Sequence, residues 1–231
     1  MIAVFTLTRE RLYYTKTCFD LLNKKAGMNF KHIVIDNGSK DGTVEWLKEY
    51  NAYRKVYLPE NKGLKYGVNL AFEIIKEMRD IDFILKFDND CEVLTEGFLR
   101  ELVEAYNLIG GKVLLSPYVK GIVNQVKRTR YVKIGEYTYG NVGHLGGICL
   151  FMPREFLEEI GWEIKAKLPY ARGVDSYLSS KARKLGYNLF YVENIFVKHI
   201  ETTHGQAKRY PEYFKRKKIE ERTYPEEEVE K

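Results

Sequence analysis

The sequence has 231 residues, of which 45% are hydrophobic and 30% are charged, and its formal net charge is +6. This length suits one large domain or two small ones, and the composition excludes a disordered chain. The mildly basic balance, with a pI near 9.0, is compatible with a phosphorylated ligand, nucleic acid or an anionic membrane surface.

The first half of the chain alternates between strand and helix patterns. Apolar runs predict strands at 2–7, 31–36, 54–58, 83–87 and 112–119. Helices are predicted at 9–25, 43–50, 64–79 and 95–109, with Thr95 as the N-cap of the last one. Such alternation predicts an α/β fold with a mostly parallel central sheet and helices on both faces.

The second half of the chain changes character. Residues 120–142 alternate polar with β-branched and aromatic residues, which predicts antiparallel strands or a mobile flap. A buried strand is expected at 148–152, helices at 153–160 and 173–185, and two short strands at 188–192 and 195–199. From about residue 205 the chain is highly charged and lacks a clear core face, which predicts a peripheral or partly disordered helix.

Cysteine usage and the apolar runs bear on the compartment. Cys18, Cys91 and Cys149 are far apart and odd in number, so they suit reduced thiols and show no zinc-site spacing. No basic region precedes the apolar start of the chain, so we expect no signal peptide, and no apolar run approaches the length of a membrane span. We therefore expect a cytoplasmic protein, for which peripheral contact with the inner face of the membrane stays open.

Two acids, Asp88 and Asp90, directly follow the predicted strand at 83–87. Residues i and i+2 of an extended chain point the same way, so the two carboxylates can converge and would repel each other. A divalent cation relieves that repulsion, and open α/β sheets bind ligands at the carboxyl ends of their strands. In isolation these residues equally suit a turn that ends the strand. Thr8 and Asp36 end two other predicted strands at the same edge, which favours the metal site.

Five stretches of the chain together suggest a family. They are VIDNGSKDGT (34–43), NKGLKYGVNLAF (61–72), FDND (87–90), GGICLFMPREFLEEIGW (146–162) and VDSYLSSKARKLGYNLFYVENIFVKH (174–199). Their order resembles that of the nucleotide-sugar-dependent glycosyltransferases of the GT-A fold, within them family 2. The resemblance implies a GT-A domain, Rossmann-like, over 1–205, with a nucleotide-binding half at 1–119 and a smaller antiparallel, acceptor-side catalytic half at 120–205. Residues 206–231 would form a charged tail.

The resemblance also implies a donor site. The residues expected to contact the nucleotide-sugar are Thr8, Asp36, Asn61, Gly63, Lys65, Asp88, Gly146 and Gly147. Asp36 would accept a hydrogen bond from the nucleotide base, although alone it suits a turn acid. Lys65 would reach phosphate, although a solvated lysine is the commoner case. The two glycines would let the backbone approach the donor sugar closely.

Asp88-Asn89-Asp90 looks like the DXD motif of this family. The resemblance implies that Asp90 binds Mn or Mg directly, with Asp88 and His199 as further ligands and His204 as a weaker candidate. Such an ion neutralises the departing nucleoside diphosphate. A lone histidine after a strand is more often structural, so the role of His199 rests on the resemblance.

Asp175 is the expected catalytic base. It occupies the place of the first aspartate in the family's Glu-Asp-x-Asp pattern, and inverting transfer needs a carboxylate to take the proton of the acceptor hydroxyl. The pattern is broken here, because Val174 and Tyr177 replace the other two acids, which puts the identity of the acceptor in doubt. Alone, Asp175 would read as an acid at a helix N-terminus.

The function implied by the resemblance is a metal-dependent, inverting hexosyltransferase. It would move a sugar from a nucleotide-sugar donor, expected to be UDP-linked, to a glycan or glycolipid acceptor, as in polysaccharide biosynthesis, and nucleic acid is not an expected partner. A nucleotidyltransferase should show a glycine-rich loop after the first strand, where this chain has TLTRER. A nucleic-acid-binding module would use Lys127, Arg128, Arg130 and the run 215–218, but no recognised motif supports it. A relative that binds the donor without turnover also stays open.

Overall fold

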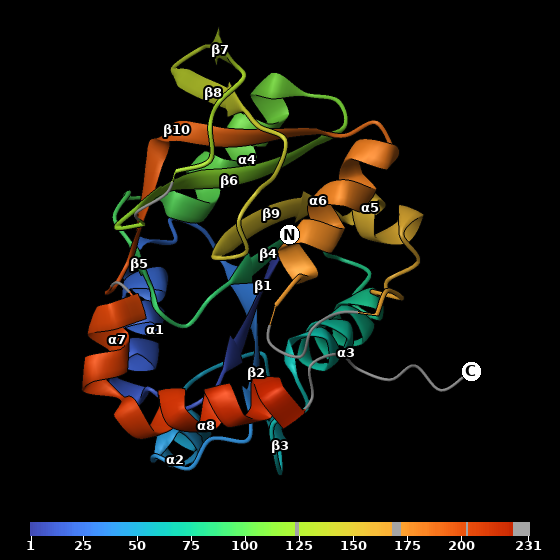
Figure 1. The fold of residues 1–231 in the computed structure, drawn as a ribbon. Coiled ribbons are helices and arrows are strands. Elements are labelled where there is room, and N and C mark those ends of the chain that lie inside the picture. The colour runs from blue at the N-terminus through green and yellow to red at the C-terminus, as the bar shows by residue number, and fades with distance from the viewer. Residues whose placement is uncertain (123–124, 168–171, 202, 224–231) are drawn as a thin grey trace.

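The structure, a computed structural model, describes residues 1–122, 125–167, 172–201 and 203–223. Within these residues, ten strands form one mixed sheet in the order β3-β2-β1-β4-β9-β6-β10-β8-β7, and β5 pairs with β10 (Figure 1). The strands are β1 (Ile2–Thr8), β2 (Phe30–Asn37), β3 (Arg54–Leu58), β4 (Phe83–Phe87), β5 (Cys91–Val93), β6 (Val113–Lys120), β7 (Arg130–Ile134), β8 (Tyr137–Asn141), β9 (Cys149–Pro153) and β10 (Asn188–His199). The helices are α1 (Leu12–Lys25), α2 (Thr43–Glu49), α3 (Leu64–Lys76), α4 (Phe98–Ile109), α5 (Arg154–Glu159), α6 (Val174–Lys184), α7 (Thr203–Arg209) and α8 (Pro211–Thr223).

The predicted α/β class is confirmed. Strands β3, β2, β1 and β4 are parallel neighbours, as the β-then-α alternation of the first half predicts. Strand β9 then enters antiparallel between β4 and β6, and β10 runs parallel to β6. The hairpin β7–β8 realises the antiparallel strands predicted within 120–142, of which residues 123–124 lie outside the described part.

The alternation of side chains places α3 on one face of the sheet and α1 and α4 on the other. Phe5 packs edge-on against Phe72 of α3, and its parallel partner in β4 is Lys86, so Lys86 points to the face that α3 covers. The other face contacts α1 and α4, where Phe87 packs against Phe98. Strand β4 is therefore buried on both sides, and one of its side chains is a lysine.

Two predicted details are wrong. Helix α4 begins at Phe98 after a left-handed Gly97, because the Thr95 hydroxyl accepts a hydrogen bond from the Phe196 amide at 2.8 Å instead of capping the helix. The two short strands predicted at 188–199 are one strand, β10, which passes its polar interruption through an irregularity between Val192 and Phe196. Strand β5, which pairs His199 with Cys91, was not predicted.

The charged end of the chain contains two helices, α7 and α8. Helix α8 runs across the end of the sheet where β1, β2 and β3 terminate (Figure 1). None of the helices in the described part of the chain is long and apolar enough to cross a membrane.

Gly27 fixes the approach of α1 to α4. Its φ is 73°, and a Cβ added there would lie 2.4 Å from the Gly97 Cα. Gly111 has a similar φ of 72° but nothing within 4 Å of an added Cβ.

We expect Gly111→Ala to lower the free energy of unfolding by about 1 kcal/mol because of the left-handed backbone. Gly27→Ala should lower it by about 2 kcal/mol more, because the added Cβ overlaps with backbone. Urea unfolding measures both, and equal losses would show that the Gly27–Gly97 approach is unimportant.

Candidate active site

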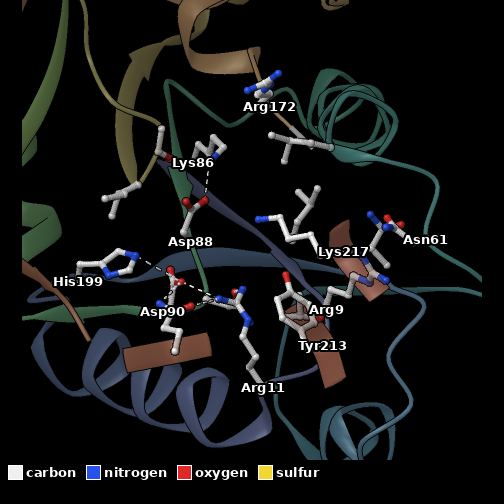
Figure 2. A pocket seen from close by; sticks show the side chains of 18 of the residues that line it. Arg9, Arg11, Asn61, Lys86, Asp88, Asp90, Arg172, His199, Tyr213 and Lys217 are labelled. Carbon is white, nitrogen blue, oxygen red and sulfur yellow. Dashed lines mark hydrogen bonds and ion pairs between the residues drawn. The ribbon is translucent and has the colours of Figure 1, made fainter. Parts of the chain in front are cut away.

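A cavity of about 420 Å³ opens at the carboxyl ends of β1 and β4 (Figure 2). Its polar lining contains Thr8, Arg9, Arg11, Asn61, Lys86, Asp88, Asp90, Arg172, Asp175, His199, Gln206, Tyr213 and Lys217. These side chains come from β1 and the turn after it, from the loop before α3, from β4 and the acids after it, from the start of α6 and the residues before it, from the end of β10 and from α7 and α8. Segments far apart in sequence therefore meet at the edge of the sheet where ligands bind in such folds.

The turn between β1 and α1 delivers two arginines to this cavity. Glu10 and Arg11 both adopt left-handed backbone, with φ of 52° and 59°. Residues other than glycine rarely adopt this conformation, and those that do are enriched at functional sites. Arg9 and Arg11 thereby both line the cavity.

Asp90 is buried in a set of donors. It accepts hydrogen bonds from Arg11 Nη1 at 2.8 Å and Gln206 Nε2 at 3.0 Å, and His199 Nε2 lies 3.5 Å from the same oxygen. Burial alone would raise the pKa of Asp90, but Arg11, His199 and the bond from Gln206 hold it below its ordinary value. Asp90 is thus a fixed negative charge at neutral pH.

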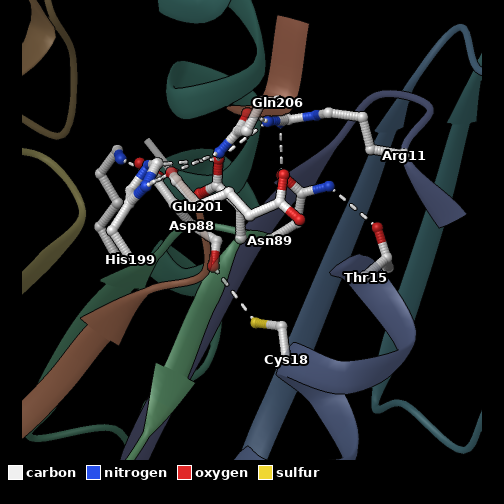
Figure 3. Close-up of polar contacts among 10 residues, drawn as sticks. Arg11, Thr15, Cys18, Asp88, Asn89, His199, Glu201 and Gln206 are labelled. Atoms are coloured by element: carbon white, nitrogen blue, oxygen red, sulfur yellow. Dashed lines mark hydrogen bonds and ion pairs between the residues drawn. The ribbon is translucent and has the colours of Figure 1, made fainter. Parts of the chain in front are cut away.

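Helix α1 holds the segment between the two acids (Figure 3). Asn89 Nδ2 donates to Thr15 Oγ1 at 2.9 Å, and Asn89 Oδ1 accepts from Arg11 Nη2 at 2.9 Å. Cys18 Sγ donates to the Asp88 carbonyl at 3.2 Å. The middle residue of the motif therefore anchors the backbone, which leaves the acids on either side of it facing the cavity.

Asp88 pairs with the buried Lys86, whose ammonium also donates to the Gly147 carbonyl. Partial burial raises the pKa of Asp88 above its ordinary value, Lys86 opposes that shift, and the neighbouring charges of Asp90 and Asp175 add to it. Two acids two residues apart thus have pKa values displaced in opposite directions. Such divergence is typical of functional sites.

Asp175 lies on the other side of Gly147, in the first turn of α6. A Cβ added to Gly147 would be 3.2 Å from the Asp175 Cβ and 3.5 Å from Lys86 Nζ. His144 Nε2 lies 3.5 Å from Asp175 Oδ2. Gly147 is therefore the point at which the Lys86–Asp88 pair and Asp175 come together.

Helix α8 closes the opposite wall of the cavity. The ring of Tyr213 lies 5.5 Å from the Arg9 guanidinium and 5.0 Å from that of Arg11. Glu220 accepts two bonds from Arg9 and one from Asn61 Nδ2 at 3.0 Å. The described part of the predicted charged tail thus packs on the domain.

The expected site residues divide into two groups. Those that line the cavity are Thr8, Asn61, Asp88, Asp90, Gly147, Asp175 and His199. Asp36 is fully buried beneath them, where it accepts bonds from Thr8 Oγ1 at 3.0 Å and from the Ser39 amide at 2.9 Å. Of the other described residues, Gly63, Lys65, Gly146 and His204 are not part of the lining.

Sequence reasoning missed several residues of the site. Lys86 had a detectable signal, because a lysine within the apolar strand FILKF needs a buried counter-ion. Arg9, Arg11 and His144 gave no comparable signal, since charged loop residues are usually solvated. Gln206, Tyr213 and Lys217 lie in the segment 206–231, for which the sequence predicts a charged tail.

Asp88, Asp90 and His199 supply donors that Mn²⁺ or Mg²⁺ accepts. Within the described residues, no group of three or more His, Cys, Asp or Glu side chains is already arranged to hold a metal ion. Positive side chains, Lys86 and Arg11, instead neutralise the two carboxylates. The donor set fits a divalent cation in its chemistry, and an ion bound there would share the carboxylates with these two cations.

Comparisons with solved structures identify the fold. The mannosyltransferase PcManGT from Pyrobaculum calidifontis superposes with a TM-score of 0.63 at 14% identity, over 91% of this chain and 60% of that one. GalNAc-T7 gives a TM-score of 0.62 at 16% identity, over 86% and 43%, and S. aureus TarS 1–349 gives 0.58 at 15%, over 83% and 60%. At this identity the likeness shows the GT-A fold alone, and the chain spans less than two thirds of the length of these proteins.

The sequence comparisons add the family. No curated protein matches the chain. The family model described as glycosyl transferase family 2 matches residues 4–161, which is more than half of the chain and includes the acids after β4. The chain belongs to glycosyl transferase family 2.

Proposed function

We propose that this protein transfers a sugar from a nucleotide-sugar, UDP-linked, to a hydroxyl of a glycan or glycolipid acceptor, with inversion at the anomeric carbon. One observation carries the proposal: Asp88, Asp90 and Asp175, from two separate segments, line a single cavity at the carboxyl ends of the strands. Family membership favours this reaction over nucleotidyl transfer.

Two of the structural neighbours support a nucleotide-sugar and a divalent cation as ligands. PcManGT was solved with GDP-Man and Mn²⁺, and GalNAc-T7 with UDP, GalNAc and Mn²⁺. These neighbours carry different bases, so the choice of UDP stays part of the proposal. The acceptor is proposed from the family resemblance, because the chain spans only part of its neighbours.

In the proposed mechanism, the Asp175 carboxylate takes the proton of the acceptor hydroxyl as that oxygen attacks the anomeric carbon. The bond between that carbon and the diphosphate oxygen breaks, and the nucleoside diphosphate leaves with the bonding electrons. Asp88, Asp90 and His199 would hold Mn²⁺ or Mg²⁺, which when bound supplies positive charge to the leaving group. Gly147 leaves room for the sugar beside Asp175, because any side chain there would meet that carboxylate.

The nucleotide would occupy the side of the cavity formed by Thr8 and Asn61. Asp36 is proposed to read the base, and its contact with Ser39 would then be exchanged for a contact with the ligand. Gly63 and Lys65 at the start of α3 and Gly146 beside Gly147 are proposed as further contacts of the donor. Each of these three residues already donates a hydrogen bond within the protein: Gly63 N to Asn61 Oδ1 at 3.1 Å, Lys65 Nζ to the Ala166 carbonyl at 3.5 Å, and Gly146 N to the Tyr191 hydroxyl at 3.2 Å.

Two substitutions test the proposed roles of the acids. On a working donor and acceptor with Mn²⁺, Asp175→Asn should lower kcat by roughly 10²–10⁴-fold, because the amide cannot accept the proton. It should leave binding of UDP with Mn²⁺ within about twofold. Asp90→Ala should weaken that binding and also abolish turnover, and EDTA should reproduce the loss in the unaltered enzyme.

Asp20→Ala, on an exposed face of α1, is the matched control and should behave as the unaltered enzyme. A panel of nucleotide-sugars identifies the donor by release of nucleoside diphosphate. If Asp90→Ala and Asp175→Asn both keep full turnover, the mechanism is wrong.

The two neighbouring glycines provide a second, finer test. An added Cβ at Gly147 would press on Asp175 and approach Lys86 Nζ, whereas one at Gly146 would meet only the Tyr191 hydroxyl at 3.5 Å. We expect Gly147→Ala to lower kcat/KM by at least about tenfold, since small displacements of reacting groups are costly. Gly146→Ala should lose less than Gly147→Ala does, because its added Cβ stays clear of Asp175 and Lys86. Steady-state kinetics with the same donor measure both variants. If the two substitutions lower kcat/KM equally, Gly147 does not lie at the site of transfer.

A further inference from the structure

The inward face of α8 carries charges where a core-packing helix would carry apolar residues. Tyr213, Phe214 and Lys217 line the main cavity, and Glu220 lines a second cavity beside it. Residues 213, 217 and 220 are spaced i, i+4 and i+7, so they share one side of the helix. A charged side chain on this side faces either a partner within the protein or a ligand.

Glu220 has its partners within the protein. It accepts bonds from Arg9 and from Asn61, which ties α8 to the β1–α1 turn and to the loop before α3. Arg216 adds an ion pair with Glu10 in that same turn. These contacts fix the helix on both sides of Lys217.

Lys217 lacks such a partner among the residues that the structure describes. Its ammonium makes no hydrogen bond or ion pair with them, and its recorded contact is a distant one with the Phe214 ring, at 6.0 Å. The side chain is half-buried and points into the cavity, toward the side on which Asp88 lies (Figure 2). A cation held in this way is poised for an anion that the protein does not itself supply.

Three other cations of the cavity are already engaged within the protein. Arg11 pairs with Asp90, Lys86 with Asp88, and Arg9 with Glu220, while Arg172, the remaining lining cation, is exposed. A diphosphate that enters between β4 and α8 would therefore meet Lys217 as an available ammonium. Lysine is a common ligand of phosphate oxygens as a mobile point charge.

We propose that Lys217 binds the diphosphate of the nucleotide-sugar, so that α8 completes the donor site from outside the region that the family model matches. This inference rests on the proposed function. It assigns a ligand to the inward face of α8, and it explains why the sequence of this helix shows no apolar stripe.

Binding of inorganic pyrophosphate tests the inference without a choice of base or sugar. Isothermal titration calorimetry in the presence of MgCl₂ compares the unaltered protein with Lys217→Ala, Lys217→Arg and Lys218→Ala. Lys218 is the control, because it has the same charge one position along the helix but is exposed. We expect Lys217→Ala to weaken pyrophosphate and UDP by roughly tenfold or more, Lys217→Arg to stay within about threefold, and Lys218→Ala to bind as the unaltered protein does.

Three results would overturn the inference. They are unchanged binding by Lys217→Ala, equal weakening by Lys217→Ala and Lys218→Ala, and an absence of pyrophosphate and UDP binding by the unaltered protein. The thermal unfolding midpoint of each variant confirms that the helix is retained. Sugar turnover is measured separately, so that the two proposals can fail independently. If Lys217→Ala binds pyrophosphate and UDP normally and the enzyme transfers sugar, only the role of Lys217 is wrong. If binding depends on Lys217 but no donor supports turnover, the proposed transferase function is wrong.

Discussion

The ion pair between Arg11 and Asp90 is the contact on which the arrangement of the site depends. Arg11 reaches Asp90 because the chain turns through left-handed backbone directly after β1. The same guanidinium donates to Asn89 and Gln206 and lies against the ring of Tyr213. One buried cation thereby joins the motif after β4 to α7 and α8, and removal of either partner would leave an uncompensated buried charge.

Much of the fold could be predicted because its signals are local. Apolar runs of strand length and helical spacing are properties of short windows, so β1 to β4 and their connecting helices emerge from the sequence with small errors at their ends. The failures involve contacts between distant segments. Thr95 has the side chain of a helix cap, but its hydroxyl accepts a hydrogen bond from the backbone amide of Phe196, which is 101 residues later in the chain. Strand β10 continues through its polar interruption because β6 pairs with it both before Val192 and after Phe196.

The site residues divide in the same way, into those with a local sequence signal and those that depend on contacts between distant segments. The convergence of Asp88 and Asp90 follows from their spacing after a strand, and the family resemblance supplied Asp175 and His199. The ion pairs that neutralise these acids could not be predicted, because Lys86 and Arg11 become their partners only through the register of β4 and the turn after β1. The contacts of helix α8 could not be predicted for a related reason: a helix with a charged inward face shows no stripe of apolar residues, which is the signal that sequence analysis seeks.

Strand β10 connects the hairpin β7–β8 to the side of the site where His199 lies beside Asp90. Over its twelve residues β10 pairs with β8 near Phe190 and with β5 at His199. Strand β5 directly follows the Asp88-Asn89-Asp90 motif. The hairpin β7–β8 and the histidine beside Asp90 thus lie on the two arms of one strand, on either side of its irregularity between Val192 and Phe196 (Figure 1). Sequence changes in the hairpin can therefore be confined to one arm of the strand while the arm that carries His199 keeps its pairing with β5.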